Sequence, residues 1–168
     1  MTSTEPRHDV KGEGPLFSAY LDFYREQLIA GVLSLSPEAQ RTTLVPSGWT
    51  PIELLSHVLH MEQRWFVWAF LAEEVGERFG DWSVPDPRGV EDARWQVADH
   101  VTAEHLVERL RAIGERTRAI LAAHSLDTVA PTGGRFEDDP AELRWICFHV
   151  LQEYARHAGH LDIVVELS

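Results

Sequence analysis

Cysteine and long apolar runs are almost missing from this sequence, and each shortage excludes a class of protein. The single cysteine, Cys147, cannot form an internal disulfide, so the chain is not a disulfide-stabilised scaffold, and we expect a small buried hydrophobic residue there. No apolar run approaches the roughly 18 residues of a membrane span. The N-terminal stretch is polar and lacks the apolar segment of an export signal, so we expect a cytoplasmic protein.

Basic residues are also scarce. The chain has 15 Lys and Arg against 27 Asp and Glu, which gives a formal charge of −12, and Lys11 is the only lysine. Phosphate binding relies on clustered basic side chains, so a nucleic-acid partner is excluded. A length of 168 residues suits one compact domain, and we expect residues 1–14 to be a flexible tail and residues 15–168 the folded domain.

Four segments have the apolar spacing of helices, and turn-rich stretches separate them. We expect the helices at about residues 15–33, 51–75, 102–124 and from 140 to the C-terminus. No stretch alternates strictly between apolar and polar residues as a half-buried strand would. The predicted fold class is therefore all-α, a four-helix bundle. The segment of residues 76–100 has too many turn residues for a helix and is expected to cross the surface, where it would form a lid over a site.

The start of the second helix is marked by its residue types. Thr50 is a favoured N-cap, Pro51 suits the first helical position, and Glu53 completes the spacing of a capping box. Between the third and fourth helices, Gly133 and Gly134 are predicted to form a disordered tip.

The last helix places two ionisable residues, Glu153 and His157, on its apolar face. At about 100° per residue, both fall on or beside the arc formed by Ile146, Val150, Leu161 and Val164. A buried carboxylate costs several kcal/mol unless a partner compensates it. Something is therefore expected to lie between the two side chains.

A divalent metal ion would fill that role, because residues four apart lie about 6 Å apart along a helix and can converge on one point. The third ligand would come from the second helix, where His57 lies at the edge of the apolar stripe and His60 falls nearer the polar side. In the alternative interpretation, Glu153 and His157 pair with each other or with an arginine. His149 and His160 also lie near this face, and we expect His149 to act only indirectly.

Three stretches resemble the DUF664 (mini-circle protein) branch of the DinB-like family: SGWTPIELLSHVLHMEQRWF, the acidic GDW region and ELRWICFHVLQEYARHAGHLDIVVE. The resemblance runs from about residue 16 to the end. The resemblance implies a four-helix bundle with a divalent metal held by three side chains. In having His, Glu and His at the ligand positions, the sequence is similar to mycothiol-dependent maleylpyruvate isomerases. The resemblance thereby selects His57, Glu153 and His157. Val165 departs from the branch, where an arginine is usual.

The resemblance implies a thiol S-transferase that uses mycothiol and a small electrophile, and it implies a homodimer. Zinc and nickel are the expected metals, because both suit imidazole and carboxylate ligands. A metal-dependent hydrolase is the first alternative, with His60, Glu62 or His149 as its general base. Glu62, however, lies within an apolar arc and is expected to be a buried salt-bridge partner. The second alternative is a non-catalytic bundle that binds a small molecule or only dimerises.

Overall fold

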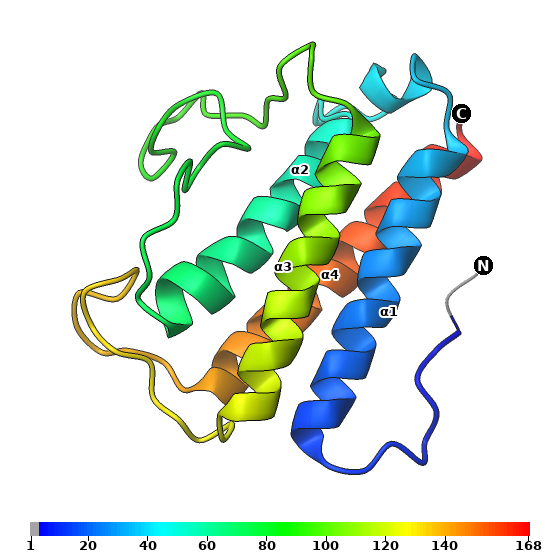
Figure 1. Cartoon of the computed structure of the whole chain (residues 1–168). Coiled ribbons are helices and arrows are strands. Elements are labelled where there is room, and N and C mark those ends of the chain that lie inside the picture. Colours follow the sequence, from blue (N-terminus) through cyan, green and yellow to red (C-terminus); the bar gives the residue numbers. More distant parts are fainter. Residues whose placement is uncertain (1–3) are drawn as a thin grey trace.

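Four long helices form the molecule and confirm the predicted all-α class (Figure 1). The computed structural model describes residues 4–168. The helices are α1 (Glu13–Ser34), α2 (Pro51–Glu62), α3 (Ala103–Ala123) and α4 (Leu143–Glu166), with a short 3₁₀ turn η1 (Ala39–Arg41) after α1. In Figure 1, α1 and α3 lie in front of α2 and α4. Strands are absent from residues 4–168, where only two isolated bridges occur. None of the helices within that range is long and apolar enough to cross a membrane.

The start of α2 follows the predicted capping box. The Thr50 side chain accepts a hydrogen bond from the backbone N–H of Glu53, and the Glu53 carboxylate accepts one from the N–H of Thr50 at 2.8 Å. Both interactions satisfy N–H groups that lack a partner inside the helix. The direction in which α2 enters the bundle is therefore fixed two turns before His57.

The end of this helix was predicted too late, at about Val75. Regular α-geometry stops at Glu62, and the chain continues as a π-helical segment, η2 (Gln63–Phe70). Ala72 then has a positive φ of 51°, and a right-handed helix cannot continue through a residue in this conformation. The apolar pattern persists beyond this point because Val75 belongs to a small second cluster with Val67 and Trp68.

The predicted disordered tip at Gly133 and Gly134 is also wrong. The N–H of Arg135 donates to the carbonyl of Trp68 at 3.3 Å, so this loop supplies a partner to the end of η2. Gly134 lies so close that an added Cβ would come within 2.2 Å of the same carbonyl oxygen. The glycine is thus present for close packing.

The fourth helix begins at Leu143, three residues after the predicted Pro140. The preceding residues are extended because they pair with the chain that follows α3. The N–H of Ala130 donates to the carbonyl of Ala141 at 2.9 Å, and the N–H of Leu143 donates to that of Thr128 at 2.9 Å. The third helix, by contrast, matches its prediction, with Thr102 as the N-cap.

An ion pair lies inside the core between α1 and α2. Arg25 is 2% exposed and Glu62 is completely buried, and Nη2 of Arg25 donates to Oε1 of Glu62 at 2.7 Å. The hydroxyls of Thr117 and Tyr154 donate to the same carboxylate. Burial lowers the pKa of Arg25, but the charge of Glu62, the hydrogen bond to it and the neighbouring Tyr154 and Asp22 together raise the pKa above its ordinary value, so the guanidinium stays charged. All four helices therefore meet at one polar point, and the predicted role of Glu62 is confirmed.

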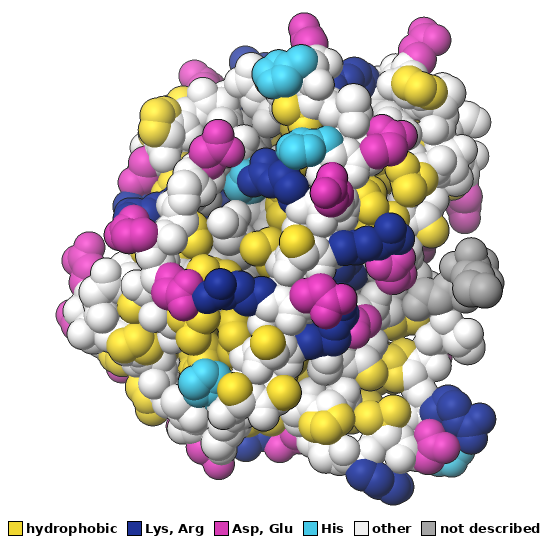
Figure 2. All heavy atoms as spheres, viewed as in Figure 1, with side chains coloured by type: hydrophobic (Ala, Val, Ile, Leu, Met, Phe, Trp, Pro, Cys, Tyr) yellow, Lys and Arg dark blue, Asp and Glu magenta, His cyan; other side chains and the backbone are white. Residues whose placement is uncertain are grey.

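On the outside, acidic and basic side chains alternate over α1 and α3 (Figure 2). Arg111 of α3 pairs with Glu26 of α1 at 2.8 Å, and Arg118 of α3 pairs with Asp22 of α1 at 2.5 Å. These exposed pairs hold the front helices in register, although each contributes little to stability.

Candidate metal centre

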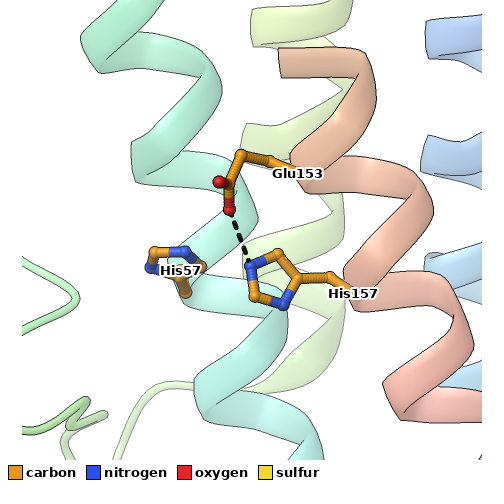
Figure 3. Close-up of side chains that lie close together, drawn as sticks. All are labelled: His57, Glu153 and His157. Carbon is orange, nitrogen blue, oxygen red and sulfur yellow. Dashed lines mark ion pairs between the residues drawn. The ribbon is translucent and has the colours of Figure 1, made fainter. Parts of the chain in front are cut away.

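The three residues predicted as metal ligands meet between α2 and α4. His57 comes from α2, and Glu153 and His157 come from α4. Each offers one ligand atom, and these atoms all lie within 4.8 Å of one another. Figure 3 shows the three side chains pointing toward a common point. Among residues 4–168, this is the one group of three or more His, Cys, Asp or Glu side chains close enough to hold an ion.

The His157 side chain is buried, and its ring nitrogens lack hydrogen-bond partners among residues 4–168. Its Nε2 lies 3.2 Å from Oε2 of Glu153, but neither ring nitrogen makes a properly aligned hydrogen bond to any residue from 4 to 168. A buried polar atom without a partner costs about 1–3 kcal/mol. The contact with His157 lowers the pKa of Glu153, although burial opposes this, so the carboxylate is ionised. An unpaired nitrogen beside a carboxylate is an arrangement that a divalent ion would complete.

His57 is oriented by a carboxylate that lies outside the helices. Its Nδ1 donates to Oδ2 of Asp81 at 2.9 Å, and Arg64 donates to both Asp81 oxygens at 2.6 and 3.0 Å. Burial lowers the pKa of His57, and the hydrogen bond to Asp81 only partly offsets this. The imidazole is therefore neutral, with its proton on Nδ1 and its lone pair on Nε2, which is the form that binds a metal.

Asp81 itself is held as a carboxylate. Burial would raise its pKa, but the hydrogen bonds from His57 and Arg64 lower it below the ordinary value. Sequence reasoning missed Asp81 and Arg64 as site residues. The segment that carries Asp81 has no periodicity from which its direction could be predicted, and only its place in the quoted GDW motif singled it out.

The segment between Leu71 and Thr102 covers one side of the centre. Trp95 stacks on the His57 ring with centroids 4.1 Å apart and a 20° tilt, and its centroid lies 5.5 Å from that of His157. Trp82 meets His57 edge-on at 6.4 Å. This placement agrees with the predicted crossing of the surface beside a site. Whether the segment moves when a substrate binds stays a prediction.

The same segment explains why the prediction for His60 was wrong. His60 was placed near the polar side of α2, yet it is 3% exposed, because every residue of α2 except Glu53 is buried. Its Nδ1 donates to the carbonyl of Ser56 at 2.8 Å. Its Nε2 faces Gly80, where an added Cβ would lie only 2.8 Å away. His60 is therefore a packed residue outside the ligand set.

The other candidate histidines also lie outside the ligand set. His149 stacks on Trp145 with centroids 5.1 Å apart and a 9° tilt. The centroid of His160 lies 5.8 Å from that of His157, with Trp49 on its other side. Glu62 is engaged by Arg25. None of these residues belongs to the group of three, although His149 lies one turn before Glu153 on α4, where burial lowers the pKa of His149 and the charge of Glu153 opposes this effect.

Cys147 cannot serve as the nucleophile either. The side chain is fully buried, as predicted, and burial raises the pKa of its thiol to about 12. A buried protonated thiol is unreactive, because the thiolate is the nucleophile. Any sulfur chemistry at this centre therefore needs a thiol from outside the protein.

A four-helix bundle that joins one His of its second helix to a Glu and a His of its fourth defines a DinB-like metal-binding bundle. The family model described as mycothiol-S-transferase matches residues 16–168. The chain therefore belongs to the mycothiol-S-transferase family, and membership implies mycothiol S-transferase activity. None of the curated proteins compared with the chain matches it.

Proposed function

We propose that His57, Glu153 and His157 hold a divalent ion at which the thiol of mycothiol is activated for transfer to a small electrophile. The observation that carries this proposal is the buried His157 ring, whose nitrogens have no hydrogen-bond partner among residues 4–168 and lie beside an ionised Glu153. Three protein ligands leave a coordination position open, as in catalytic rather than structural sites.

A bound divalent ion supplies positive charge that lowers the pKa of a thiol, so that thiolate is available near neutral pH. The residues around the centre prepare it for this chemistry. Asp81 holds Nδ1–H of His57 and keeps Nε2 free, and Trp95 excludes water from one face of that imidazole. The Glu153 side chain is 21% exposed against 8% for His157, so reactants approach from the side of Glu153.

The reaction forms a bond between the sulfur and an electrophilic carbon. The thiol loses its proton to solvent, and the electron pair displaced from that carbon either departs with a leaving group or, when a conjugated double bond is broken, moves onto the electron-withdrawing group, which then takes up a proton. The one cysteine of the chain is buried and protonated, which fits an enzyme that takes its thiol as a substrate.

The metal is proposed to be zinc or nickel, because both suit imidazole and carboxylate ligands. A homodimer, a cytoplasmic location and the division into a tail of residues 1–14 and a domain of residues 15–168 also stay predictions. Size-exclusion chromatography with light scattering would check the dimer.

The deciding experiment is elemental analysis of untagged protein, comparing the native chain with His57→Ala/His157→Ala and with the control His149→Ala. We expect about one ion per chain in the native protein and in the control, and none in the double variant. Metal-loaded protein would then be assayed with mycothiol and a panel of electrophiles. A native chain that binds neither zinc nor nickel, or a loaded chain that transfers no thiol, would overturn the proposal.

A further inference from the structure

A cavity lies next to Trp82 and Trp95, the two aromatic residues that pack beside His57. Its volume is about 430 Å³, and half-buried Trp49, Trp82 and Trp95 line it together with Glu53 and Arg94. Small-molecule sites have volumes of about 300–1,000 Å³. The cavity is thus of the right size for a small ligand, and half of the six tryptophans of the chain converge on it.

The three indole rings do not stack on one another, and Trp95 has one of its faces covered by His57. The centroids of Trp49 and Trp95 lie 6.4 Å apart with a 54° tilt, and those of Trp82 and Trp95 lie 6.3 Å apart with a 76° tilt. Rings at such angles do not cover each other. Exposed indole faces pack well against the C–H faces of a saturated ring, while the indole N–H can bond to a hydroxyl.

The polar groups of the cavity carry both signs of charge. No residue from 4 to 168 accepts a hydrogen bond from the Arg94 guanidinium, so its five N–H donors face solvent. Glu53 uses Oε2 for the N–H of Thr50 at 2.8 Å, which leaves Oε1 to accept. Both residues line the cavity, and a donor together with an acceptor suits the hydroxyls of a neutral polyol. An anion would meet repulsion from Glu53.

The cavity and the metal centre share one wall. Trp95 lines the cavity and also stacks on His57 at 4.1 Å, so a ligand in the cavity is separated from the metal ligands by about one ring. A molecule with a ring-shaped polyol at one end and a thiol at the other could therefore occupy both places.

We propose that the cavity formed by Trp49, Trp82 and Trp95 binds the sugar portion of mycothiol and directs its thiol arm toward His57, Glu153 and His157. This inference rests on the proposed function, because it assigns a place to the non-reacting part of the same substrate. The binding free energy of that part would hold the thiol near the reaction centre.

Calorimetric titration with glucosaminyl-inositol, the sugar portion of mycothiol without its thiol arm, tests this assignment. The protein would be used both metal-loaded and after chelation, since the cavity contains no predicted metal ligand. We expect the fragment to bind both forms, Trp49→Ala to weaken binding about tenfold, and Trp145→Ala, a matched exposed tryptophan on another face, to change nothing. Arg94→Ala is the second variant, because an exposed side chain is removed without risk to folding.

Thiol-transfer kinetics provide the second measurement. Trp49→Ala and Arg94→Ala should raise KM for mycothiol with little change in kcat and with native metal content. Equal fragment binding by Trp49→Ala, Arg94→Ala and Trp145→Ala, or no binding to the native protein, would overturn the assignment. Fragment binding without any thiol transfer would instead leave the cavity assigned and refute the proposed function.

Discussion

Asp81 accepts a hydrogen bond from Nδ1 of His57 across 2.9 Å, although it belongs to an irregular segment and His57 to a helix. Arg64, which lies in η2 after helix α2, donates hydrogen bonds to both oxygens of the same carboxylate. The neutral form of His57 that the proposed metal site needs is therefore set by a residue outside the three proposed ligands.

The substitution Asp81→Asn tests that relationship. It preserves shape but places an amide beside Arg64 and removes the charge that fixes the His57 tautomer, so we expect metal affinity to fall about 10–100-fold. Competition with a chromophoric chelator measures this. Asp86→Asn, in an exposed pair with Arg88 on the same segment, is the control and should bind metal normally. Unchanged affinity in Asp81→Asn would show that packing alone orients His57.

Arg25→Ala should destabilise the bundle strongly. It leaves the fully buried Glu62 without its positive partner, and breaking a buried pair in this way costs about 3–5 kcal/mol. Urea denaturation gives the free energy of unfolding. Arg111→Ala removes the exposed pair with Glu26 and should cost about 0–1 kcal/mol. Similar losses in the two variants would mean that Thr117 and Tyr154 are enough to solvate Glu62.

Gly134→Ala should destabilise the junction between η2 and the loop before α4. The added methyl group would lie 2.2 Å from the carbonyl oxygen of Trp68, and backbone cannot move aside cheaply, so we expect a loss of about 1–3 kcal/mol or more. Gly76→Ala is the matched control, because nothing lies within 4 Å of its added Cβ. Thermal unfolding of both variants gives the comparison, and a Gly134→Ala protein as stable as the native one would contradict the close approach.

Cys147 should resist alkylation in the native protein. Burial raises the pKa of its thiol to about 12, whereas the thiol pKa of an unfolded cysteine is about 8.5. At pH 8 the native thiol is therefore protonated and the unfolded one is partly ionised, so iodoacetamide should label the protein only in concentrated urea. Mass spectrometry counts the label. Rapid labelling of the native chain at pH 8 would reveal an accessible thiolate.

The sequence predicts the helical elements well because their signals are local. The Thr50 capping box and the spacing of Glu153 and His157 need only a few neighbouring residues to be recognised. His60 could not be placed correctly, since its burial depends on residues 71–102, which fold over α2 from outside. The π-helical turn of η2 and the late start of α4 at Leu143 depend likewise on hydrogen bonds to distant loops. The contacts of Asp81 and Trp95 with His57 could be recognised only in the tertiary structure.

The three proposed metal ligands lie on regular helices, whereas the aromatic side chains beside them come from residues 71–102. Asp81 and Trp95 of that segment contact His57, but substitutions among residues 83–94 would leave both in place, and helices α2 and α4 are fixed by the Arg25–Glu62 network and the capping box. On the proposed function, residues 83–94 could therefore vary selectivity without touching the three proposed ligands. A laboratory evolution experiment could diversify residues 83–94 for new electrophiles and retain one invariant reactive core.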